Sequence, residues 1–149
     1  MPKDWIIFGV LAGFVGNIVK EALAWILYAF GWVRYTFVHI GAGYFVDAEF
    51  IDNPVSLLTG FIADWVVAGT IGVIIVYLLR ITGSDYAILK GVGIGAVTYL
   101  LFYGALMALD VTRASLLTPL PNLLLFFPHL LYGGIAGWFA EKYGRKTRL

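Results

Sequence analysis

Four ionisable residues lie deep within long apolar segments of this sequence, far from either expected membrane surface: Lys20, Glu21, Asp64 and His129. A charge at the centre of a bilayer costs about 2.5 to 3.5 kcal/mol on insertion scales, so such residues must pair, become neutral or contact water. Two acids stand against one lysine, which leaves a carboxyl group that should titrate or require a cation. The set could form a structural ion pair, a proton or ion relay, or a pocket for a lipid headgroup.

These residues are predicted to share one depth in the membrane. Counted from the expected outer end of each helix, Glu21, Asp64, His129 and Tyr99 lie ten or eleven residues inward. At 1.5 Å per residue this places them about 15 to 17 Å deep, near the bilayer centre. Asn17 falls on the same third of the first helix's circumference as Glu21. The candidate site is therefore a buried polar layer of six residues: Asn17, Lys20, Glu21, Asp64, Tyr99 and His129.

Other kinds of chemistry have less support in the pattern. Asp64 and His129 could act as an acid–base pair, but no nucleophile accompanies them, so an intramembrane enzyme is the weakest hypothesis and no catalytic residue is predicted. The chain has no cysteine, and His39 and His129 are poorly matched with acids, so neither a metal nor a cofactor is expected. A net charge of +1 provides no basic stripe for nucleic acid.

The elements that must position the polar layer are four long apolar segments, at 5–32, 55–79, 86–109 and 120–140. Of the 149 residues, 61% are apolar and 13% are charged, whereas soluble domains are about half apolar and a quarter charged. Each segment has the roughly 20 residues that a helix needs to cross a bilayer, and a helix satisfies its own backbone groups there. The sequence predicts a single all-α transmembrane domain over residues 1–149, a four-helix bundle.

Lysine and arginine are distributed unevenly between the two ends of this bundle. Seven lie near the termini or in the turn between the second and third segments, and two lie in the opposite loops. The seven are Lys3, Arg80, Lys90, Lys142, Arg145, Lys146 and Arg148, and the two are Arg34 and Arg113. Because basic residues favour the cytoplasmic side, we predict a multi-pass protein of the cell membrane with both termini in the cytoplasm.

The connection over residues 33–54 is longer than a turn. It is rich in aromatic and glycine residues and carries three acids. It could lie flat as an interfacial helix or dip back as a re-entrant loop. We favour the interfacial position, because the apolar part of this connection is too short to cross the bilayer.

Small residues recur at helical spacing in all four segments, as at Gly9 and Gly13 or at Gly91 and Gly95. Such rows let helix backbones approach closely in lipid, where no hydrophobic force draws helices together. This pattern predicts helix–helix contact and carries no information about function.

Three fragments resemble a known group of membrane proteins: the glycine-rich stretch 9–17, the aromatic stretch 35–39 and the sequence LLYGGIAG at 130–137. The chain is similar in these fragments and in hydropathy to the YqhR-like small membrane proteins of Gram-positive spore-forming bacteria. The resemblance implies four membrane spans. It implies no activity and no functional residues.

Two functional hypotheses follow, besides the enzyme. The first is a non-enzymatic subunit or scaffold whose partners are the bilayer and either further copies or a larger membrane complex. The alternative is an oligomeric transporter or channel for protons or small ions, with Glu21 or Asp64 as the coupling carboxylate. Four helices enclose little volume, so transport would require more than one copy.

Overall fold

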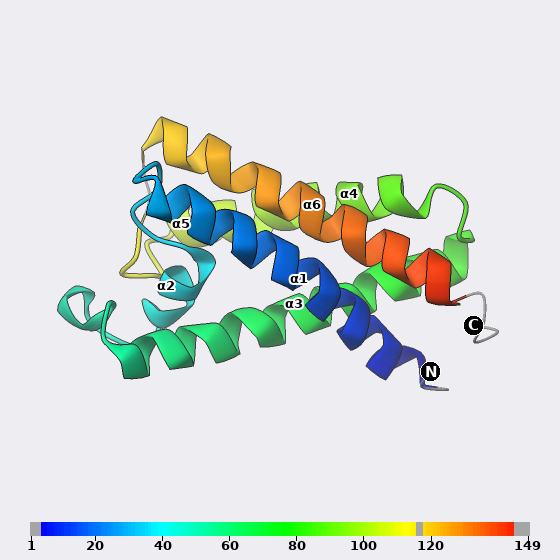
Figure 1. Ribbon diagram of the computed structural model, residues 1–149, viewed down its shortest axis with the longest axis horizontal. Helices are drawn as coiled ribbons and strands as arrows, with labels where there is room; N and C mark the ends of the chain where they lie inside the picture. Colours follow the sequence, from blue (N-terminus) through cyan, green and yellow to red (C-terminus); the bar gives the residue numbers. More distant parts are fainter. Residues whose placement is uncertain (1–3, 116–117, 145–149) are drawn as a thin grey trace.

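In the computed structural model, which describes residues 4–115 and 118–144, every regular element is a helix. Four stretches are long and apolar enough to cross a membrane: α1 (Trp5–Ala29), α3 (Pro54–Thr82), Ala87–Ala108 and α6 (Pro119–Gly144). They run side by side as a bundle, and the start of α1 and the end of α6 lie at the same end of it (Figure 1). We call this the terminal end and the opposite one the loop end. For the described residues, the predictions of an all-helical fold and of four helices long and apolar enough to cross a membrane are confirmed.

The ends of the helices follow from local chemistry. At the start of α3, the Asn53 side chain accepts a hydrogen bond of 2.9 Å from the Val55 amide, and Pro54 occupies the first helical position, where its missing N–H costs nothing. The first span was predicted to continue to residue 32 but ends at Ala29, because Gly31 adopts a positive φ of 73° that no α-helix contains.

Close glycine contacts hold the spans together. A methyl group at Gly91 of α4 (Ala87–Thr98) would collide with the carbonyl oxygen of Gly133 in α6. A methyl group at Gly72 of α3 would likewise collide with the backbone of Gly13 in α1. The backbones therefore meet directly at two crossings, as small-residue rows allow in lipid.

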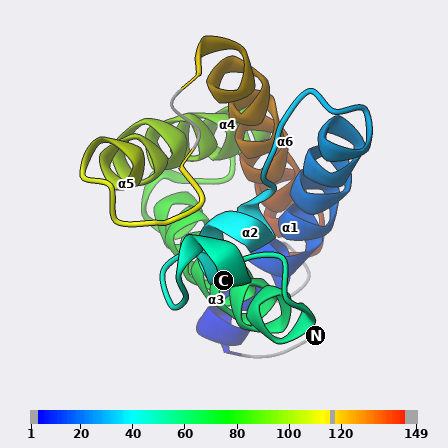
Figure 2. The same ribbon diagram turned by 90° about the vertical axis from the view of Figure 1, so that its left-hand side faces the viewer.

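The connection between the first two spans contains a short helix, α2 (Phe37–Ala42), and a 3₁₀ turn, η1 (Ala48–Phe50). All six residues of α2 are buried, and end-on views place the helix among α1, α3 and α5 (Gly104–Ala108) (Figure 2). An interfacial helix needs one face free for lipid, and α2 has none. The burial of α2 therefore does not fit the flat interfacial helix that the sequence favoured, and it leaves the re-entrant loop as the alternative prediction.

His39 of α2 illustrates how this segment is held. Its Nδ1 accepts a hydrogen bond of 3.2 Å from the Thr36 amide, and its Nε2 lies 3.5 Å from a carboxylate oxygen of the exposed Asp52. Burial lowers the pKa of His39 from its ordinary value of 6.5, and Asp52 opposes that shift only partly. Protonation of Nδ1 would remove the acceptor of the Thr36 amide, so this hydrogen bond favours the neutral ring.

The first prediction concerns acid stability. Because the pKa of His39 is lowered on folding, the unfolded chain binds the proton more readily, and stability present above pH 6.5 is lost as the pH falls below it. We expect the unfolding temperature in detergent to fall between pH 7.5 and pH 5.5. His39→Asn keeps an acceptor for Thr36 but cannot gain the proton, so its unfolding temperature should fall less. An equal fall in both proteins would contradict this role of His39.

Candidate functional site

A buried ion pair joins the first two spans. Lys20 of α1 lies with its Nζ 2.5 Å from Oδ1 of Asp64 in α3, and the Asn17 amide donates a hydrogen bond of 2.8 Å to Oδ2 of the same carboxylate. Asn17 is fully buried and the other two side chains are nearly so. We call these three residues the polar clamp. Both carboxylate oxygens of Asp64 are used inside the bundle.

Glu21 is the surplus carboxylate beside the polar clamp. Its Oε1 lies 3.5 Å from the Lys20 ammonium, and its side chain is buried inside the bundle. Neither of its oxygens accepts a hydrogen bond within the described part of the chain. The sequence predicted one carboxyl group in excess of the single lysine. The structure identifies it as Glu21, because Asp64 pairs with Lys20.

Phe37 of α2 connects the polar clamp to His129. The Lys20 ammonium lies 4.5 Å from the centre of the Phe37 ring, a cation–π contact, and the same ring meets the His129 imidazole edge to face at 4.7 Å. His129 places its Nδ1 3.1 Å from the Leu125 carbonyl oxygen one turn earlier in α6. The sequence analysis did not include Phe37, because it placed this segment at the membrane surface.

The predicted acid–base pair does not form a direct contact. Asp64 is engaged by Lys20 and Asn17, while the imidazole of His129 faces the Leu125 carbonyl oxygen through Nδ1. No hydrogen bond joins Asp64 to His129 among the described residues. General acid–base exchange between the two would need a bridging water or a substrate.

Tyr99 joins the layer through its ring alone. It begins a π-helical turn, η2 (Tyr99–Tyr103), and its ring lies 5.1 Å from the His129 imidazole and 4.5 Å from the stacked Tyr103 ring. Its hydroxyl donates to the backbone carbonyl of Asn122, and the Tyr103 hydroxyl donates to the Asn122 side chain at 3.0 Å. The hydroxyl of Tyr99 is thus directed away from the polar clamp.

Tyr132 is a further buried polar residue that the sequence analysis missed. It follows His129 by three residues on the same face of α6, and its hydroxyl donates a hydrogen bond of 2.5 Å to the Ala68 carbonyl oxygen of α3. The three-residue spacing from His129 was the one feature of the sequence that could have indicated that Tyr132 faces the same way. The bond ties the fourth span to the second just beyond the polar clamp.

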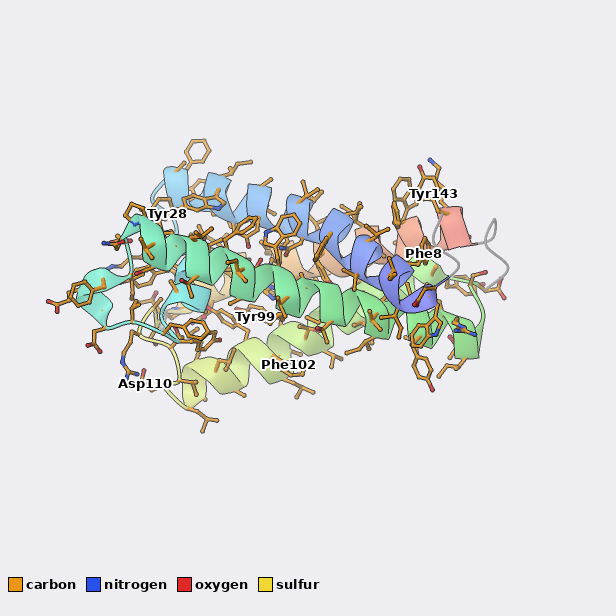
Figure 3. The ribbon with its side chains drawn as sticks, turned by 90° about the horizontal axis from the view of Figure 1, so that it is seen from below. Phe8, Tyr28, Tyr99, Phe102, Asp110 and Tyr143 are labelled. Carbon is orange, nitrogen blue, oxygen red and sulfur yellow. The ribbon has the colours of Figure 1, made fainter. Side chains whose placement is uncertain are left out.

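A pocket with a cavity volume of about 110 Å³ adjoins these residues. Its polar wall includes Lys20, Asp64 and His129, and its apolar wall comes from α2, α3 and the third span. Phe102 contributes to the apolar wall from the stretch that runs beside α3 (Figure 3). The pocket therefore combines charged groups at its base with a hydrocarbon-like rim.

Comparison with known proteins adds no relative: no protein-family model, curated protein or solved structure matches this chain. The similarity to the YqhR-like group remains a prediction from the three fragments. The functional argument therefore depends on the geometry of the polar layer and the pocket.

Proposed function

We propose that the protein is a non-enzymatic subunit or scaffold of the cell membrane, in which the polar clamp fixes the register of α1 against α3. The supporting observation is that Asp64 directs one oxygen to Lys20 and the other to Asn17, so the three groups satisfy one another. Interhelical polar contacts contribute on average only about 0.6 kcal/mol to stability. Their main effect is to select one alignment of the two helices over others. The lipid-facing surface is then free for contact with other membrane helices.

We place both termini in the cytoplasm. Three basic residues lie in helix ends at the terminal end of the bundle: Arg80 near the end of α3, Lys90 near the start of α4 and Lys142 near the end of α6. Arg34 and Arg113 lie in the connections at the opposite, loop end. The four other basic residues counted for this prediction lie outside the described residues: Lys3, Arg145, Lys146 and Arg148. Modification of an Asp85→Cys variant by a membrane-impermeant maleimide in intact cells would contradict this orientation.

A second candidate function, proton or small-ion transport by an oligomer, is favoured by one observation. Glu21 is a buried carboxylate that accepts no hydrogen bond from the described residues, and the nearest cation, Lys20, is already held by Asp64. A buried acid without a full set of partners is typical of intramembrane proton and ion sites.

Flux measurements separate the two functions. If the protein is a scaffold, proteoliposomes with the wild-type chain should pass protons and sodium no faster than empty liposomes, and Glu21→Gln should behave identically. Glu49→Gln, at an exposed position of the loop end, is the matched control. Wild-type flux that Glu21→Gln abolishes and Glu49→Gln preserves would overturn the scaffold proposal and support transport.

Cross-linking tests the scaffold directly, because the chain has no cysteine of its own. Single cysteines at Leu58, Ile62 and Val66 would sample exposed positions of α3, one of the four helices long and apolar enough to cross the membrane. A subunit should form a covalent adduct with a second copy or another protein from at least one such lipid-facing position in native membranes. A scan of all the exposed positions of the four spans that gave only monomer would count against a scaffold.

A further inference from the structure

The pocket beside the polar clamp opens sideways, at the depth of the lipid chains. Its lining includes Val67 of α3 and Phe102 of η2, residues that are 53% and 61% exposed on the surface of the bundle. Val67 lies near the midpoint of α3 (Pro54–Thr82), a helix long enough to cross the membrane. A molecule that enters between these two side chains therefore comes from the hydrocarbon, where water-soluble ligands are scarce.

The base of the pocket offers a hydrogen-bond acceptor. His129 faces the Leu125 carbonyl oxygen through Nδ1, and a carbonyl oxygen can only accept, so Nδ1 carries the ring proton. In the neutral imidazole the other nitrogen, Nε2, then bears a lone pair. Nε2 has no hydrogen-bond partner within residues 4–115 and 118–144. A ligand group that contacts it must donate a proton, as a hydroxyl group does.

Lys20 supplies the complementary donor. Its ammonium also lines the pocket and has three N–H groups, of which Asp64 engages one at 2.5 Å and Glu21 faces another at 3.5 Å. A hydroxyl group can accept from Lys20 while it donates to His129. An anionic head would instead bring a further negative charge next to Asp64 and Glu21 near the centre of the membrane, which is costly.

The size of the pocket limits the ligand further. A cavity of about 110 Å³ is smaller than the cavity of about 150 Å³ that accommodates benzene in an engineered protein. A hydroxyl group with its first few carbons fits this space, whereas a glycerophosphate headgroup does not. The rest of an alkyl chain would continue past the apolar rim into the bilayer.

We propose that this pocket binds the hydroxyl head of a neutral long-chain alcohol dissolved in the membrane, with the head between Lys20 and His129 and the chain leaving between Val67 and Phe102. The proposal stands apart from the scaffold function, since it depends on the pocket and on His129. Its ligand class follows from the lone pair of the imidazole, the nearby ammonium and the lateral opening.

Photolabelling tests the proposal. Hexadecanol that carries a diazirine near its hydroxyl end, presented in proteoliposomes, should label pocket residues of the wild-type protein. Leu106→Trp places an indole in the pocket lining and should lower labelling about tenfold, which corresponds to about 1.4 kcal/mol of binding free energy. Leu101→Trp, at an exposed position on the same span outside the pocket lining, should label as the wild type does.

Two further comparisons test recognition of the hydroxyl group. His129→Phe keeps a ring against Phe37 and Tyr99 but removes the acceptor, so labelling should fall. The methyl ether of the same probe cannot donate, so it should label the wild-type protein more weakly than the alcohol. Equal labelling by alcohol and ether, or equal labelling of Leu106→Trp and Leu101→Trp, would overturn the proposal. The comparison of alcohol with ether uses the wild-type protein, so it tests recognition of the hydroxyl group even if His129→Phe does not fold.

Discussion

Gly91→Ala is expected to lower the free energy of unfolding by about 3 kcal/mol, because the added methyl group collides with backbone and not with a movable side chain. The atom it meets is the carbonyl oxygen of Gly133, and the Cα of Gly137 lies 3.3 Å away. Relief would require α4 and α6 to separate along their shared face. Unfolding in mixed micelles, followed by circular dichroism as denaturing detergent is added, measures the loss.

Gly93→Ala provides the matched control on the same helix. A methyl group at Gly93 would meet no atom within 4 Å. Since alanine favours helix over glycine, this variant should match the wild type or exceed its stability by up to about 1 kcal/mol. Equal destabilisation by Gly91→Ala and Gly93→Ala would show that the glycine contact between α4 and α6 does not hold the spans together.

Lys20→Met should be the most damaging change in the polar clamp. It removes the single cation from a site where Asp64 and Glu21 are both buried, and loss of one partner from a buried ion pair costs about 3 to 5 kcal/mol. Lys90→Met is the control. Lys90 is partly exposed, and its hydrogen bonds to the described residues are to carbonyl oxygens at the end of α3, so the change should cost less than about 1 kcal/mol.

Asp64→Leu should cost less than Lys20→Met, although it removes the shorter of the two ionic contacts. The Lys20 ammonium can turn to Glu21, which already lies 3.5 Å away, so the buried cation keeps a partner. The double variant Lys20→Met with Asp64→Leu should be more stable than Lys20→Met alone, because it leaves one buried acid in place of two. If Lys20→Met proves no worse than Asp64→Leu, Glu21 does not act as a second partner for Lys20.

The spans were predictable because hydrophobic length alone decides whether a segment can cross a bilayer. The polar layer could be predicted for a related reason, because residues at equal distances from the helix ends lie at equal depth in the membrane. That count placed Asp64 level with Glu21, and Lys20, the neighbour of Glu21 in the sequence, lies in contact with Asp64. Helix ends were less predictable, because a single backbone angle at Gly31 shortens α1.

Features that depend on irregular backbone were missed. The π-helical turn at Tyr99 changes the register of the third span, and neither hydropathy nor small-residue spacing indicates it. Phe37 lies on a six-residue helix that is stable only because other helices surround it. Sequence periodicity says nothing about such a short element. The contact of Phe37 with Lys20 and His129 was therefore available only from the structure.

The buried position of α2 has a consequence for how the chain is made. Its backbone is held by parts of the chain that are synthesised later: Gly41 lies against Gly60 of the next span, and the Ile40 carbonyl accepts a hydrogen bond of 2.8 Å from Thr112 after the third span. We therefore expect that the contacts of this helix are completed only after residue 112 has been synthesised. On this reasoning the loop end closes late in the synthesis of the chain, after the first three of the four long apolar helices have been made.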